Sequence, residues 1–395
     1  MEVEPPQSLK KPLVVVEKTM MGPGPSNYPQ RVIDALGKQV MGHLHKETCE
    51  IMDDIKEGIQ YIFQTKNEIT MCVSASGHGG MDATMCNLLE ENDVALFGAT
   101  GHWGHRAADM AKRYGADVRI LESELGKALS VDEIKSAIEL HKPVIFFLAH
   151  CDSSTGVVQS YLGDIGLICR KHNVIFIVDT VASLGGIDFL MDEWKIDVAY
   201  TGSQKCLGAP PGITPISLND RAMFKITSRK SPVKVYYWDF ILIATYWKCF
   251  PSEQRIYHHT ISVTLLYGLR EALAIMAEEG LQSSIRRHTS CSFKLQQGVE
   301  KMGLEMFVKL PFHRASTVNA IKVPEGVDWT KVSDYAMNKY KLEISGGLGP
   351  TKGKVWRIGL LGLNASSEKV DLVLKILKES IENTSDFIFV DKSKM

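Results

Sequence analysis

The sequence of 395 residues lacks the features that mark several large classes of protein. Its eight cysteines are scattered without a CxxC pair, so we expect no metal site and a reducing compartment. No apolar run approaches the roughly 20 residues that a membrane-spanning helix needs. Lys and Arg total 45 against 46 for Asp and Glu, so charge attracts the chain neither to nucleic acid nor to an anionic membrane. We therefore expect a small ligand rather than a polymer.

The two ends of the sequence differ in what they indicate about targeting. The stretch MEVEPPQSLKKPL at the start contains acidic residues and prolines, unlike a signal or transit peptide. The last residues, Ser393-Lys394-Met395, resemble the peroxisomal address Ser-Lys-Leu. We therefore expect import into peroxisomes through a receptor that recognises this ending, with the cytoplasm as the alternative location.

Short apolar runs alternate with helical stretches over most of the sequence. Runs such as VIFFLA and VIFIV are typical of strands that are buried on both faces of a parallel sheet. The pattern predicts an N-terminal arm over 1–20 and a large α/β domain over 21–280, with a mainly parallel sheet covered by helices. Strand-like pieces between helices predict a smaller α+β domain over 281–395.

Ligands of an open parallel sheet bind beyond the carboxyl ends of its strands, so the residues after each apolar run are candidates. Ser76, Gly77 and His78 open a helix, where backbone N–H groups can bind a phosphate, although a tight turn fits equally. Trp103 can stack on a flat ring or pack in the core. Ser153 lies in a polar loop after the next run.

Two further runs end in stronger candidates. Asp179 closes VIFIV, and a carboxylate there is costly to bury unless a cation or donor meets it, although helix capping is also open. Gln204 and Lys205 follow VAYTGS; a solvated turn is the commonest place for a lysine. Together these groups suit pyridoxal 5′-phosphate, which needs a phosphate cradle, an aromatic plate, a carboxylate at its ring nitrogen and a lysine that forms a Schiff base.

Segments along nearly the whole chain resemble the class V branch of the fold-type-I pyridoxal-phosphate aminotransferases, in particular its alanine–glyoxylate (serine–pyruvate) group. The segments are MMGPGPSN, IMDDIKEGIQYIFQT, SASGH, WGHRA, DSSTGVVQ, VDTVASLGG, TGSQKCLGAPPG, YHHT and GGLGPTKGKVWRIGLLG. The resemblance implies that Lys205 is the Schiff-base lysine and proton shuttle and that Asp179 pairs with the ring nitrogen. It also implies that Trp103 stacks on the ring and that Ser153 lies near its 3-hydroxyl group.

The same resemblance assigns the remaining groups. The phosphate would be held by Ser76, Gly77, His78 and Gln204, and by Tyr257 and Thr260 of a neighbouring subunit, which makes the active unit a homodimer. Arg357 would bind the substrate carboxylate, with Gly24 also at the substrate site. On the residues alone, Arg357 reads as a surface residue of a strand, and Gly24 as part of a chain turn near a ligand.

The implied reaction is ping-pong transamination of L-alanine or L-serine with glyoxylate, giving pyruvate or hydroxypyruvate and glycine, as in glyoxylate detoxification. The insect 3-hydroxykynurenine transaminases share these motifs; Gly42 and Gly77 favour the glyoxylate enzymes, whereas His43 replaces their usual serine. A desulfurase of the same branch would need a cysteine near the small domain, and none follows residue 291. An NAD-linked dehydrogenase would need a glycine fingerprint that the sequence lacks. A binding protein without catalysis would not need both Lys205 and Asp179, and a cofactor-free aldolase would not need the cradle.

Overall fold

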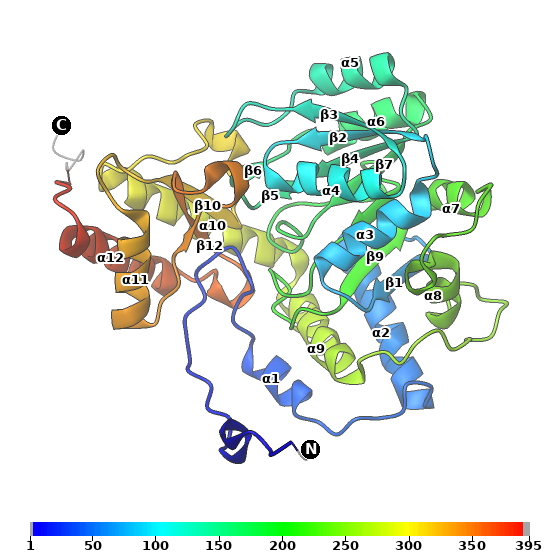
Figure 1. The fold of residues 1–395 in the computed structure, drawn as a ribbon, viewed down its shortest axis with the longest axis horizontal. Coiled ribbons are helices and arrows are strands. Elements are labelled where there is room, and N and C mark those ends of the chain that lie inside the picture. Colours follow the sequence, from blue (N-terminus) through cyan, green and yellow to red (C-terminus); the bar gives the residue numbers. More distant parts are fainter. Residues whose placement is uncertain (1–2, 390–395) are drawn as a thin grey trace.

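The computed structural model describes residues 3–389, and a seven-stranded sheet forms the centre of its larger part (Figure 1). The strand order is β1 (Ile69–Val73), β9 (Thr214–Leu218), β8 (Val198–Tyr200), β7 (Ile175–Asp179), β4 (Ile145–Ala149), β2 (Val94–Ala99) and β3 (Asp117–Glu122). Only β9 runs antiparallel to its neighbours. Every residue of β1, β4 and β7 is buried, as continuous apolar runs require.

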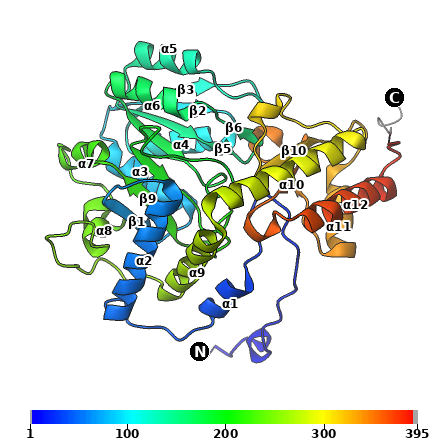
Figure 2. The same ribbon diagram turned by 180° about the vertical axis from the view of Figure 1, so that it is seen from behind.

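Helices cover both faces of this sheet. Those on the face toward the viewer in Figure 1 are α3 (Gly77–Leu88) and α4 (His102–Arg113). Figure 2 shows α5 (Val131–His141) and α6 (Leu162–Lys171) on the opposite face. The other helices of this part are α1 (Gln30–Leu36), α2 (Lys46–Phe63), α7 (Asp220–Thr227), α8 (Phe240–Tyr246) and α9 (Val263–Glu279). The predicted α/β fold is confirmed.

The C-terminal part is built on a three-stranded antiparallel sheet in the order β10 (Val318–Lys322), β12 (Val355–Gly359), β11 (Ser345–Gly346). The helices α10 (Leu281–Lys301), α11 (Trp329–Tyr340) and α12 (Ser367–Thr384) accompany it. Its core is separate from that of the large sheet and includes Leu295, Trp356 and Leu377. Leu281 and Ile285, at the start of α10, pack into the large core, so this helix contributes to both.

Short elements complete the chain. They are the ribbon β5 (Cys151–Asp152) with β6 (Val157–Val158) and the 3-10 turns η1 (Gln7–Lys10), η2 (Tyr236–Trp238), η3 (Pro311–His313), η4 (Gly349–Thr351) and η5 (Gly362–Asn364). The N-terminal segment contacts the C-terminal part of the chain, where Thr19 forms an isolated β-bridge with Leu342. The division at residues 20 and 280 stays a prediction.

Within residues 3–389, no helix has the length and apolarity needed to cross a membrane. The same residues contain no cluster of three or more His, Cys, Asp or Glu side chains suited to a metal ion. The tripeptide Ser393-Lys394-Met395 lies outside the described residues.

Candidate active site

A cavity opens at the carboxyl ends of β1, β4, β7 and β8 and brings together residues that are far apart in the sequence. Its empty space, with the open mouth included, is about 550 Å³. The lining residues are Ser76, Gly77, His78, Met81, Trp103, Cys151, Ser153, Asp179, Val181, Ala182, Gln204 and Lys205. The candidates that were predicted from separate strand ends in the large domain therefore meet in one place.

Lys205 lines this cavity from the turn after β8. Its Nζ donates a hydrogen bond to the carbonyl oxygen of Pro23. Gly24 follows with φ of +103°, and a Cβ atom added there would lie 2.5 Å from the Lys205 Nζ. Burial, followed by the nearby charge of Arg357, lowers the pKa of Lys205 to about 8. A substantial share of the amine is thus neutral near physiological pH, as a nucleophile or base requires.

Asp179 ends β7 and points into the same cavity. Its carboxylate accepts hydrogen bonds from the Val181 N–H at 2.8 Å and from the Tyr200 hydroxyl at 2.8 Å. The register of the parallel strands explains the second bond, since Asp179 and Tyr200 pair at the ends of β7 and β8. Burial raises the pKa of Asp179 to about 6, although both hydrogen bonds favour the ionised form. The carboxylate is therefore poised to hold a proton that a ligand shares with it.

The start of α3 forms a cradle suited to an anion. Ser76 occupies the N-cap position and lines the cavity with Gly77 and His78, and its side chain makes no hydrogen bond that caps the first N–H groups of the helix. A Cβ atom added to Gly77 would lie 3.1 Å from a methyl group of Val181, so a larger residue would crowd the cradle. Gln204 contributes a buried amide oxygen without a partner among the described residues. Rotation of this amide presents its N–H groups instead.

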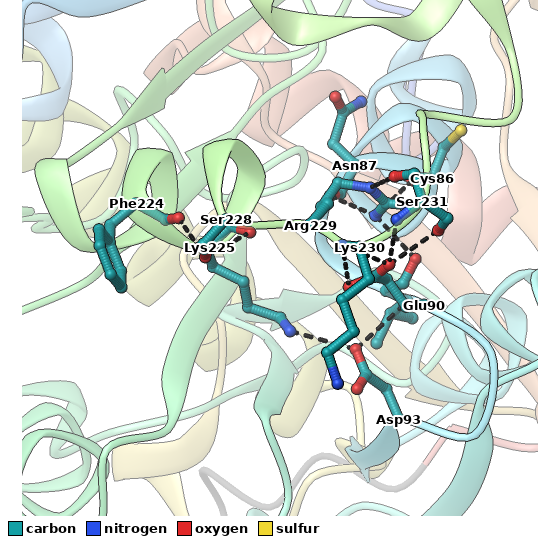
Figure 3. A network of polar contacts seen from close by, with 11 residues as sticks. Cys86, Asn87, Glu90, Asp93, Phe224, Lys225, Ser228, Arg229, Lys230 and Ser231 are labelled. Atoms are coloured by element: carbon teal, nitrogen blue, oxygen red, sulfur yellow. Dashed lines mark hydrogen bonds and ion pairs between the residues drawn. The ribbon is translucent and has the colours of Figure 1, made fainter.

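The far end of α3 is held by a network of polar contacts (Figure 3). Arg229 donates to the carbonyl oxygens of Cys86, Asn87 and Leu89 at 3.3, 2.8 and 2.9 Å. A cation at a helix C-terminus satisfies free carbonyl groups and interacts favourably with the helix dipole. Glu90 accepts from the backbone N–H groups of the two residues that follow Arg229. The network fixes the helix whose other end forms the cradle.

Trp103 is positioned by the loop after β4. The buried carboxylate of Asp152 accepts from the Trp103 N–H at 3.1 Å, and the Ser154 hydroxyl accepts from the His102 N–H at 2.9 Å. The indole N–H donates to the Ser153 hydroxyl at 2.8 Å. Asp152 and Ser154 thus cap α4 from another segment. Sequence reasoning treated this stretch as a polar loop and did not single out Asp152.

Arg357, in β12 of the small sheet, reaches the same region without lining the cavity itself. Its Nη1 donates to the carbonyl oxygen of Ser153 at 3.0 Å, and its Nε donates to that of Gly346 at 2.7 Å. Burial lowers the pKa of Arg357 to about 10, so it remains positively charged. Arg357 is only 8% exposed, and the interpretation of this residue from the strand pattern as a surface arginine is wrong.

Tyr257 and Thr260 do not line the cavity of their own chain. Their hydroxyl groups are 3.0 Å apart, and Tyr257 is 48% exposed. The ring of His43, the residue after Gly42, lies 4.9 Å from the ring of Tyr257. These residues form a separate surface group, so their predicted role toward a neighbouring subunit stays a prediction.

Comparison with known proteins places the chain in a family. The family model described as aminotransferase class-V matches residues 20–373. The chain belongs to the class V aminotransferases. It is 58% identical over 395 residues to an alanine–glyoxylate aminotransferase of Drosophila melanogaster, with all of both chains covered. This aminotransferase is thus similar over its full length to a relative with a named activity.

Solved structures of aminotransferases are also similar to this chain in fold. A Nostoc alanine–glyoxylate aminotransferase is 38% identical, with a TM-score of 0.91 and coverage of 96% of this chain and 100% of the other. A ureidoglycine–glyoxylate aminotransferase of Bacillus subtilis is 34% identical, with a TM-score of 0.92 and coverage of 97% of each chain. The family implies pyridoxal phosphate as cofactor. The cavity fits this group, because it offers a lysine amine, a buried carboxylate, an indole and an uncapped helix start.

Proposed function

We propose that this aminotransferase exchanges the amino group of L-alanine or L-serine with glyoxylate, giving pyruvate or hydroxypyruvate and glycine. The names of its relatives in Drosophila melanogaster and Nostoc support alanine and glyoxylate, and serine is proposed as a second donor from the sequence resemblance. The observation that carries the chemistry is the meeting of Lys205 and Asp179 in one cavity beside an anion cradle. The two groups come from the ends of neighbouring strands, β7 and β8, and their pKa values are shifted toward each other.

When bound, pyridoxal phosphate supplies an aldehyde and an electron-withdrawing ring that stabilises negative charge at the substrate α-carbon. Lys205 would hold the cofactor covalently through Nζ. When free, the same Nζ would take the proton of the substrate α-carbon and release it elsewhere on the bound reactants, and a pKa of about 8 suits both the uptake and the release. Asp179 would keep a proton on the ring nitrogen, with its own position fixed by Tyr200 and Val181.

Arg357 would bind the carboxylate that all the proposed substrates share. Its bonds to two backbone carbonyl oxygens hold the guanidinium plane in one orientation. A fixed, planar guanidinium group binds a carboxylate through two parallel hydrogen bonds. This arrangement orients the substrate α-carbon and does not require a second charged group on the substrate.

The active unit in this proposal is a homodimer in which each Tyr257 and Thr260 serve the neighbouring chain's phosphate. Support comes from exposed apolar side chains in and beside this loop: Ile256 and Tyr257 within it, Leu44 next to His43, whose ring lies 4.9 Å from that of Tyr257, and Tyr236, whose ring lies 4.9 Å from that of His258. A group of exposed apolar side chains in one region supports an interface there. His43 would then approach the partner's cavity, which makes it a residue that tunes the choice of donor.

Steady-state assays test the substrates. Alanine with glyoxylate is expected to give a larger kcat/KM than 3-hydroxykynurenine with glyoxylate, and Lys205→Ala should abolish both activities. A larger kcat/KM with the kynurenine donor would make this enzyme a kynurenine-type transaminase. Full activity of Lys205→Ala would refute the mechanism itself.

Peroxisomal location is proposed on the ending Ser393-Lys394-Met395 alone. Fluorescent fusions that carry the last residues with and without this tripeptide test it. Import of the first and not the second is expected, and equal cytoplasmic signal from both would contradict it.

A further inference from the structure

Two consecutive histidines, His258 and His259, are buried although they lie in the loop between the exposed residues Tyr257 and Thr260. Their Nδ1 atoms lie 2.7 Å apart. The Nε2 of His259 is 2.5 Å from the hydroxyl oxygen of Ser74, and the Nε2 of His258 is 3.1 Å from the carbonyl oxygen of Tyr236. The catalytic groups described above do not include this chain of contacts.

Hydrogen-bond chemistry fixes the direction of the chain. A carbonyl oxygen only accepts, so the Nε2 of His258 carries a proton and donates to Tyr236. In neutral His258, Nδ1 is then an acceptor, so the Nδ1 of His259 donates to it. The Nε2 of neutral His259 is left as an acceptor for the Ser74 hydroxyl. Every donor along the chain thus finds one acceptor.

Burial keeps His259 uncharged. The pKa of His259 is lowered to about 4, first by burial and then by His258 and His43. The rings of Tyr237 and Tyr246 pack beside His259 at 5.0 and 5.7 Å. The neutral form of His259 is therefore the form present at physiological pH.

Both ends of this series of hydrogen bonds, Ser74 and Tyr236, are connected to α3. Ser74 precedes the cradle residue Ser76 by two positions, at the end of β1. At the other end, η2 continues to Trp238, whose indole N–H donates to Asp82 of α3 at 3.1 Å. The carbonyl oxygen of Trp238 accepts from Asn87 of α3 at 2.6 Å. This segment begins at Arg229, which holds the end of α3 in Figure 3.

The backbone of the pair also joins Tyr257 to Thr260. We propose that His258 and His259 are positioning residues that hold the loop 257–260 against the cradle. The cradle and the loop would then each present a fixed geometry to a phosphate group. This inference rests on the proposed function, in which the cradle serves one phosphate and the loop serves that of the neighbouring subunit. The pair would then connect the two phosphate sites of the dimer.

The test separates binding of the phosphate from general stability. Dissociation constants of pyridoxal 5′-phosphate and of pyridoxal, which lacks the phosphate, are measured by absorbance on full-length protein freed of cofactor. The ratio of the two constants reports the contribution of the phosphate. His259→Leu removes both side-chain bonds of His259, whereas His259→Asn retains a donor near the Nδ1 position. Ser74→Ala removes one bond only, and His141→Asn, in the last turn of α5, is the matched control.

In His259→Leu the advantage of the phosphorylated ligand should fall on the order of tenfold, the factor that about 1.4 kcal/mol gives. His259→Asn and Ser74→Ala should show smaller losses, and His141→Asn none. If His259→Leu does not fold, these two milder variants still decide. Equal weakening of both ligands, or unchanged constants, would overturn the positioning role. If wild-type protein shows no preference for the phosphorylated ligand, the proposed function fails first, so the two failures are distinguishable.

Discussion

Replacement of Asp179 by asparagine should stabilise the protein without cofactor while it destroys activity. The carboxyl group has a pKa of about 6 in the fold against an ordinary value of 3.8. Between these pH values the unfolded chain has released a proton that the folded chain still holds, so stability falls as pH rises through the window. The pKa difference of 6 − 3.8, at 1.36 kcal/mol per pH unit, corresponds to a loss of about 3 kcal/mol in the free energy of unfolding above pH 6.

The asparagine side chain in this variant would not titrate, and its amide can accept from Val181 and donate to the Tyr200 oxygen. Urea unfolding of cofactor-free wild type and Asp179→Asn should therefore give similar free energies near pH 4, where wild-type Asp179 is largely protonated. At pH 8 the variant should be more stable by about 2–3 kcal/mol. A difference that does not change with pH would refute the reasoning. Turnover and pyridoxal phosphate affinity should both fall at every pH.

Three further substitutions test other parts of the site. Arg357→Lys keeps the charge but loses the planar fork, so KM for both amino and keto acids should rise by about tenfold or more, with a smaller change in kcat; unchanged KM values would contradict carboxylate binding. Tyr200→Phe removes one hydrogen bond to Asp179, so the pH window of the stability loss should move upward, and an unmoved window would show that the bond does not matter. Arg229→Ala should lower the free energy of unfolding by about 1–3 kcal/mol, with Lys230→Ala as the control; equal stability of both would contradict its role at the end of α3.

The sequence predicted the strand-end residues well because their physics is local. A fully apolar strand that ends in Asp179, or in the turn of Lys205, leaves its polar residue at the edge where the other parallel strands also end. The sheet order was not needed for this prediction. The same reasoning placed Trp103 and Ser76 correctly in the cavity.

Other features depend on partners that are distant in the sequence. Arg357 is buried where β12 packs close enough for its guanidinium group to donate a hydrogen bond to the Ser153 carbonyl oxygen, and nothing in KVWRIG shows this. Asp152 caps a helix that begins about 50 residues earlier, a contact invisible to a local capping rule. The hydrogen bond from Tyr200 to Asp179 could be predicted only from the positions of both residues at strand ends. That prediction would have required the register of β7 and β8, which pairs the two residues.

The most direct test of the account is chemical labelling of the lysine. The purified protein is incubated with pyridoxal 5′-phosphate and reduced with borohydride, and its peptides are mapped by mass spectrometry. The account predicts one dominant modified residue, Lys205, and loss of that label in Lys205→Ala. A label spread over surface lysines, or a dominant label on another lysine, would contradict the central claim.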